Sequence, residues 1–151
     1  LWKTDGTPGG TRLVKDIDPG LVSSGPSGFL SFNGLTIFTA RSPLGNELWR
    51  TDGTAAGTQL IKDINPGFDD SNPRNLVVFQ DQVFFSAKSA ESGQELWRTD
   101  GTAAGTVLVK DINPGPASSD VSNITVVGDQ LLFSADDGVN GFELWESDGS
   151  T

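Results

Sequence analysis

The feature that most constrains this chain is a repeated block of sequence. Residues 47–58 read ELWRTDGTAAGT, and residues 95–106 read the same twelve letters. A related string, LWKTDGTPGGT, occupies residues 1–11, and FELWESDGST occupies residues 142–151. Self-similarity at a fixed period of about 20 to 50 residues is typical of solenoids, propellers and other arrays. We therefore expect a row of equivalent units that bury their cores against one another.

A second block follows each of the first three copies and sets the length of the unit. It reads RLVKDIDPG at 12–20, QLIKDINPG at 59–67 and VLVKDINPG at 107–115. Together with tryptophans spaced 47, 48 and 48 residues apart, it gives a unit of about 48 residues. We expect residues 1–151 to be one repeat array from a longer protein, with a partial blade at 1–20, blades at 21–67 and 68–115, and a partial blade at 116–151.

The sequence of each complete unit predicts four short strands. In the third copy these are residues 75–80 and 83–87 around a turn at Asp81-Gln82, then 95–98 and 107–112. Equivalent hairpins lie at 29–40, around Asn33-Gly34, and at 124–135, around Gly128-Asp129. Asn-Gly suits a type I′ turn because both central residues there need positive φ.

The second strand of each unit is apolar at consecutive positions, as in TIF, VFF and LLF. A strand that is apolar on both faces indicates burial between two neighbouring layers. The predicted fold is therefore all-β, a segment of a β-propeller made of consecutive four-stranded antiparallel blades. Three units are too few to close a ring, and we expect an open face carrying Leu132 and Phe133 to be covered by further blades of the same chain or by a second copy, forming a six-bladed ring.

The composition excludes several classes of function. With 20 acidic and 10 basic residues the formal charge is −10, which disfavours binding to nucleic acids and is compatible with an extracellular setting. No apolar run of about 18 residues is present, so membrane insertion is not expected. The chain contains neither histidine nor cysteine. Catalysis by an imidazole base or a thiolate nucleophile is excluded in this segment.

Carboxylates are the remaining candidates for catalysis, and their distribution argues against it. Glu47, Glu95 and Glu143 recur at the same repeat position, with Asp63 and Asp111 nearby in the second block. A glycosidase needs two acids at a defined separation. An active site is normally built once, however, so we interpret these repeated acids as structural and predict that the chain is not an enzyme.

The repeat resembles a known family. The strings ELWRTDGT at 47–54 and 95–102, ELWESDGS at 143–150 and LWKTDGT at 1–7 are similar to the ELWxxDGT repeats of bacterial proteins. The resemblance implies a propeller-like architecture in a large secreted or surface-associated protein. Members often carry Asp-Asp-Gly before ELW, and here only Asp136-Asp137-Gly138 matches that pattern.

The recurring tryptophans and aspartates are expected to be structural. A large aromatic at one position per unit would fill the gap between neighbouring sheets. An aspartate followed by glycine would accept hydrogen bonds from the backbone of its own turn. These repeat positions are Trp2, Trp49, Trp97, Trp145, Asp5, Asp52, Asp100 and Asp148.

No cofactor is expected, and calcium is the alternative. Asp69, Asp70, Asp136 and Asp137 concentrate oxygen ligands in two loops, although neither loop has the spacing of an EF-hand or of a nonapeptide repeat. Neighbouring acids of this kind are commonly solvated.

Three functions remain open. The leading one is a non-catalytic structural or interaction module of a secreted or cell-surface protein, whose variable loops at 40–46, 88–94 and 136–142 face a protein partner. The second is a carbohydrate-binding propeller, for which Phe142 is the one aromatic in those loops. The third is the non-catalytic part of a larger propeller enzyme.

Overall fold

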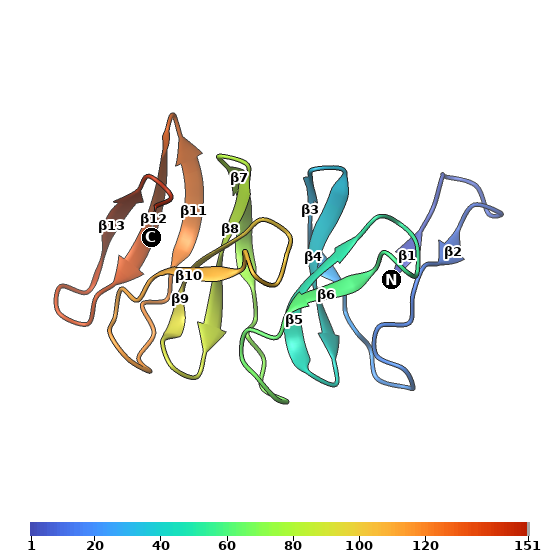
Figure 1. The fold of residues 1–151 in the computed structure, drawn as a ribbon, viewed down its shortest axis with the longest axis horizontal. Helices are drawn as coiled ribbons and strands as arrows, with labels where there is room; N and C mark the ends of the chain where they lie inside the picture. The colour runs from blue at the N-terminus through green and yellow to red at the C-terminus, as the bar shows by residue number, and fades with distance from the viewer. Residues whose placement is uncertain (151) are drawn as a thin grey trace.

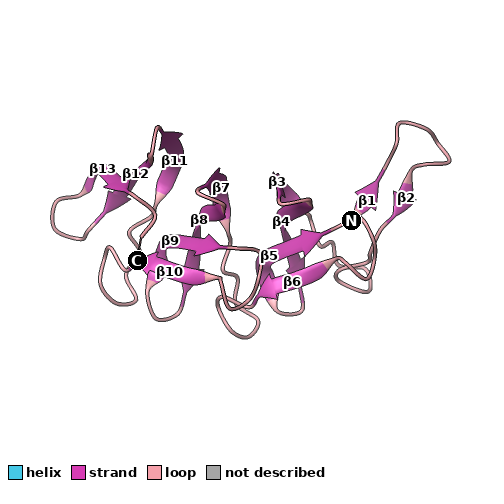
Figure 2. Cartoon of the chain, turned by 45° about the horizontal axis from the view of Figure 1, so that its top comes forward, coloured by secondary structure: helices cyan, strands magenta, loops and turns pink. Residues whose placement is uncertain are grey.

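The chain folds entirely into strands and turns over the residues that the computed structural model describes, 1–150 (Figure 2). The strands form four antiparallel sheets, which we number along the chain. Sheet 1 pairs β1 (Trp2–Lys3) with β2 (Arg12–Leu13). The all-β prediction is confirmed.

The other three sheets are meanders in which each strand pairs with the next. Sheet 2 contains β3 (Ser27–Phe32), β4 (Leu35–Ser42), β5 (Gly45–Thr51) and β6 (Gln59–Lys62). Sheet 3 contains β7 (Arg74–Phe79), β8 (Gln82–Ser89), β9 (Gly93–Thr99) and β10 (Val107–Lys110). Sheet 4 contains β11 (Ser122–Val127), β12 (Gln130–Asp136) and β13 (Phe142–Ser147).

The four sheets stand side by side in a row, with sheet 1 and sheet 4 at opposite ends (Figure 1). Apolar layers fill the spaces between them. Between sheets 2 and 3, Ile37 and Leu48 on one side pack with Phe85 and Trp97 on the other. Between sheets 3 and 4, Phe84 belongs to the equivalent layer.

The second strands of sheets 2 and 3, β4 and β8, are buried on both faces, as the sequence predicts. Neighbouring residues Phe84 and Phe85 are 1% and 0% exposed and belong to different apolar layers, because successive side chains of a strand point to opposite faces. The same alternation corrects one expectation. We expected both Leu132 and Phe133 on the open face of sheet 4. Phe133 is buried against sheet 3 instead, and of these two residues Leu132 alone points toward the open face.

Several strand boundaries differ by a few residues from the sequence expectation, among them the first turn and the end of the fourth strand of sheet 3. The turn between β7 and β8 is Gln80-Asp81 rather than Asp81-Gln82, and both residues have positive φ, 48° and 58°. The fourth strand ends at Lys110 rather than at Ile112, because the chain leaves the sheet there to enter the linker to sheet 4. The Asn33-Gly34 turn has positive φ at both residues, as expected for type I′.

Candidate functional site

One polar group that the fold encloses completely is the carboxylate of Glu47 on β5. Its side chain is fully buried and accepts three hydrogen bonds. The backbone N–H groups of Ile64 and Ser71 donate to it over 3.1 Å each, and the Ser71 hydroxyl donates over 2.5 Å. Ile64 and Ser71 belong to residues 63–73, the linker from sheet 2 to sheet 3. The glutamate therefore ties this linker to sheet 2.

Glu95 on β9 repeats the arrangement one unit later. Ile112 N–H donates to its carboxylate over 3.0 Å, Ser119 N–H over 2.9 Å and the Ser119 hydroxyl over 2.5 Å. Residues 111–121 form the linker from sheet 3 to sheet 4. We call each of these clusters, Glu47 with Ile64 and Ser71, and Glu95 with Ile112 and Ser119, a glutamate latch.

Each latch serine also joins the linker to the following sheet. The Ser71 carbonyl accepts a hydrogen bond from the Lys88 N–H of β8 over 2.8 Å, and the Ser119 carbonyl accepts one from Asp136 N–H of β12 over 2.9 Å. The same residue thus contacts the sheet that it leaves and the sheet that it enters. This geometry fixes the spacing of neighbouring sheets.

Close passage of the linker also requires glycine at the start of the third strand. A Cβ on Gly93 would lie 2.2 Å from the carbonyl oxygen of Ala117, and Gly93 has a φ of +62°. Any side chain here would push the linker away from the latch.

The latch carboxylates have raised pKa values. Burial raises the pKa of Glu47 to about 7, since loss of water disfavours the charged form more strongly than the three hydrogen bonds favour it. The neighbouring Asp63 carboxylate raises it further. Burial likewise raises the pKa of Glu95, against the hydrogen bonds from Ser119 and Ile112.

The serine hydroxyl accommodates either protonation state. The Ser71 Oγ lies 2.5 Å from the Glu47 carboxylate and 3.3 Å from the Asn46 carbonyl oxygen. It donates to the carboxylate when Glu47 is ionised. When Glu47 is protonated, the hydroxyl accepts that proton's hydrogen bond and donates to the carbonyl instead.

The recurring aspartates close the turn after the third strand. Asp100 Oδ1 accepts hydrogen bonds from the Thr102 N–H over 2.8 Å and the Thr102 hydroxyl over 2.7 Å. These bonds, the hydroxyl's above all, hold the pKa of Asp100 below its ordinary value. A Cβ on Gly105 would lie 2.1 Å from the same Oδ1, so a side chain here would displace the Asp100 carboxylate from Thr102. Asp5 and Asp52 make the equivalent bonds, and Asp148 accepts from Ser150 N–H.

Basic side chains form a second set of hydrogen bonds between neighbouring sheets. Lys3, Arg50 and Arg98, at one repeat position, each donate to a glycine carbonyl in the Asp-Gly turn of the next unit. Lys62 Nζ donates to the Thr106 carbonyl over 2.8 Å and lies 5.9 Å from the centre of the Trp97 ring. The lysine of this fourth strand therefore bonds the neighbouring sheet.

The four tryptophans differ in burial. Trp49 and Trp97 are 7% and 8% exposed and pack against the preceding sheet. Trp145 is half-buried, and its indole N–H donates to the Ala135 carbonyl over 3.1 Å. Trp2 is 66% exposed, because no sheet precedes sheet 1 in the described residues.

The calcium candidates are already engaged within the chain or isolated. Asp70 accepts a hydrogen bond from Asn46 N–H over 2.8 Å and pairs with Arg41 at 3.2 Å. Asp136 and Asp137 accept bonds from the backbone of their own loop. Asp69 is exposed. Within residues 1–150, no three acidic side chains are grouped as a metal ion would require.

The latch serines are the residues that sequence reasoning missed. Ser24, Ser71 and Ser119 are separated by 47 and 48 residues, the same intervals as the first three tryptophans. The linker segments that follow Pro-Gly, 68–73 and 116–121, share few other residues, so the block comparison ended at Pro-Gly. Tracking single positions at the repeat interval would have found them.

Comparison of the chain with protein-family models, curated proteins and solved structures found no match. The resemblance to ELWxxDGT repeats therefore stays a prediction. In the part of the chain that the structure describes, no helix is long and apolar enough to cross a membrane.

Proposed function

We propose that this chain is part of a β-propeller that acts as a non-catalytic scaffold, presenting variable loops to a protein partner. The four-stranded antiparallel meanders, stacked face to face through apolar layers, support the propeller. The −10 charge and the resemblance to ELWxxDGT repeats support a bacterial secreted or cell-surface setting.

The observation that supports a non-catalytic role best is that the recurring carboxylates are bonded within the chain. In both latches, every carboxylate oxygen accepts a hydrogen bond from the chain itself, and the groups are fully buried. A carboxylate enclosed in this way cannot approach a substrate in solvent. We therefore interpret the repeated carboxylates as groups that hold neighbouring sheets at a fixed spacing.

The turns between the second and third strands differ in sequence from one unit to the next. These are the tips at 43–44, 90–92 and 137–141, which lie along the lower edge of the row (Figure 1). Ala90 and Glu91 at the middle tip are exposed. Loops on a rigid scaffold that differ in sequence are where binding surfaces are usually built.

A loop exchange tests the scaffold. Replacing Ala90 and Glu91 with Gly and Ser should change the free energy of unfolding by less than about 0.5 kcal/mol, as for other exposed positions. A loss as large as that caused by a latch variant such as Ser71→Ala would show that the tips are part of the structural framework and are not free to serve recognition.

Glycan recognition is a second candidate, favoured by one observation. Phe142 is 60% exposed, and its chain neighbours Gly141 and Glu143 help to line a shallow cavity of about 410 Å³. A glycan array with the whole chain, and with Phe142→Ala as the matched control, separates the two functions. Saturable binding that Phe142→Ala removes would replace the protein-scaffold proposal, and no binding is expected.

A further inference from the structure

The lower edge of the row exposes large apolar side chains around the tip of sheet 2. Phe68, in the linker 63–73, is 86% exposed although complete sheets stand on both sides of that linker. Val22 in the preceding linker is 61% exposed, and Leu44 at the tip itself is 41% exposed. Single exposed apolar side chains are common, whereas a group of them rimmed by polar residues marks an interaction site. Whether these three side chains lie together is therefore decisive.

Backbone contacts bring both linkers to this tip. On one side, the Ser24 carbonyl accepts a hydrogen bond from the Arg41 N–H of β4 over 2.8 Å. On the other side, the Asp69 carbonyl oxygen lies so close to Gly45 that a Cβ on this glycine would clash with it. The apolar residues next to these contacts therefore surround one tip. We call them the apolar patch: Val22, Leu44 and Phe68.

The tip of sheet 3 has the same surroundings but different side chains. Here Asp69 stands at the repeat position of Val22, and Pro116 stands at that of Phe68. Both line one cavity of about 440 Å³ together with Ala90 of the tip, which shows that these repeat positions share a surface. Since a charged aspartate replaces the valine, sheet 3 does not repeat the apolar patch. A surface that departs from the repeat in this way is suited to recognition.

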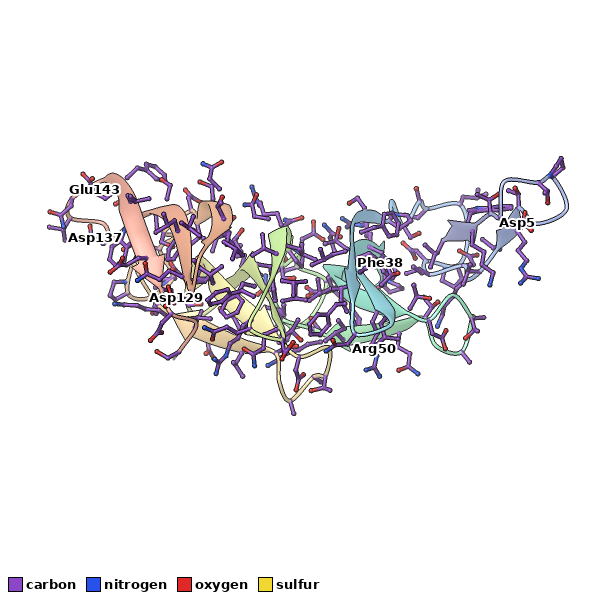
Figure 3. All side chains as sticks on the ribbon, turned by 90° about the horizontal axis from the view of Figure 1, so that it is seen from above. Asp5, Phe38, Arg50, Asp129, Asp137 and Glu143 are labelled. Carbon is purple, nitrogen blue, oxygen red and sulfur yellow. The ribbon has the colours of Figure 1, made fainter. Side chains whose placement is uncertain are left out.

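The surroundings of the apolar patch are acidic. Seven aspartates and one lysine occur in the three linkers along the lower edge (Figure 1), 14–26, 63–73 and 111–121. The lysine, Lys15, donates its amine to the Thr58 carbonyl over 2.7 Å. Acidic side chains continue along the row, from Asp5 at one end to Asp137 at the other (Figure 3). The resulting negative potential attracts a basic partner and repels an anionic one.

We propose that the apolar patch binds a segment of the protein partner in which a large apolar side chain stands beside a lysine or arginine. This inference rests on the proposed scaffold function and adds the surface and the chemistry of the partner. The apolar side chain of the partner packs between Val22 and Phe68. Asp69 is exposed next to Phe68 in the chain and pairs with the base. Buried aromatic contacts supply most of the affinity of such an interface, whereas charges at its rim act mainly on specificity and association rate.

Selection from a library of random displayed peptides tests the patch without a known partner. Peptides retained by the whole chain are sequenced, synthesised with a fluorescent label and titrated by fluorescence anisotropy. We expect the retained peptides to carry an apolar residue beside lysine or arginine, and their binding to weaken with added salt. Phe68→Ser should weaken that binding about tenfold, as for truncation of a central aromatic contact. Asp69→Asn should reduce the salt dependence of binding, because it removes the charge that faces the base.

Val78→Ser is the matched control, because Val78 is 41% exposed on β7 beside the turn at the opposite edge of the row. Both positions are exposed, so neither substitution should change the melting temperature. Equal losses of binding in Phe68→Ser and Val78→Ser, retained peptides without basic residues, or no retained peptide would overturn the proposal. Peptides that bind through Ala90 and Glu91 instead would also overturn it, but they would leave the scaffold function in place. The loop exchange described above tests that function independently.

Discussion

The hydroxyl of Ser71 lies 2.5 Å from the buried carboxylate of Glu47, and this contact joins the segment entering sheet 3 to the sheet that the chain has just left. Ser119 and Glu95 repeat it at the same distance. Stacked sheets in a repeat array could slide against one another if only apolar side chains met. A directional bond to a buried charge fixes their register.

Loss of the latch hydroxyl should destabilise the array. Ser71→Ala leaves a buried carboxylate with one donor fewer, and we expect the free energy of unfolding to fall by about 1–3 kcal/mol. Denaturant unfolding followed by circular dichroism measures it. Ser122→Ala is the control, because no side-chain hydrogen bond of Ser122 is present in the described residues. Equal losses in the two variants would contradict a specific role for the latch.

Stability should fall as the pH rises toward neutrality. The folded state raises the pKa of Glu47 from the ordinary 4.5 to about 7, and that of Glu95 in the same direction. Between about pH 4.5 and 7 Glu47 of the folded protein keeps a proton that it has lost in the unfolded chain, so each pH unit costs up to about 1.4 kcal/mol from this carboxyl.

The pH dependence should be assigned with Glu47→Gln, which cannot ionise. Its slope between pH 5 and 7.5 is expected to be shallower than that of the unmodified protein, whatever its absolute stability. The carboxyl group of Asp100 changes stability with pH in the opposite direction. Its lowered pKa adds stability to the folded state, and this stability is lost as the pH falls below 3.8. An unchanged slope in Glu47→Gln would show that other groups cause the pH dependence.

Burial distinguishes the repeated tryptophans. Trp97→Ala removes a side chain that is 8% exposed and should cost about 3–5 kcal/mol, the usual effect of deleting a large core aromatic. Trp2→Ala, at the same repeat position but 66% exposed, should cost far less. Chemical denaturation of both variants measures the difference. Similar losses would mean that the apolar layer between sheets 2 and 3 contributes little.

The turn aspartates should act without a metal ion. Asp100→Ala removes two hydrogen bonds to Thr102 and is expected to lower stability by about 1 kcal/mol. Melting temperatures of the unmodified protein in excess calcium and in a chelator should be the same. A rise with calcium that Asp100→Ala abolishes would instead identify the turn as a cation site.

Local patterns predicted the sheets well and the latches poorly. Two consecutive phenylalanines at 84 and 85 already indicate a strand buried on both faces, because alternation places one on each side. The contact from Glu47 to Ser71 spans 24 residues and depends on how the linker folds back across Gly45, which no periodic pattern encodes. The repetition of the glutamate predicts a structural role. Its partner, the serine, can be identified only once the path of the linker is known.

The role of Lys62 shows the same limit. Its alternation with apolar neighbours correctly places it on the fourth strand, and strand chemistry then suggests an exposed edge. Its amine reaches across to Thr106 in the next sheet, 44 residues away. The pairing between units depends on the stacking distance, which the sequence of a single unit does not specify.

Hydrogen exchange of backbone amides tests most directly whether glutamates lock neighbouring sheets together. Ile64, Ser71 and Ile112 lie outside the strands, and each donates its amide to a latch carboxylate. Their exchange should be slow, like that of β8, and Glu95→Ala, which removes the acceptor, should release Ile112 while Ile64 stays protected. If these amides exchanged as fast as those of Ala90 and Glu91 at the exposed tip, the latches would not hold the array together.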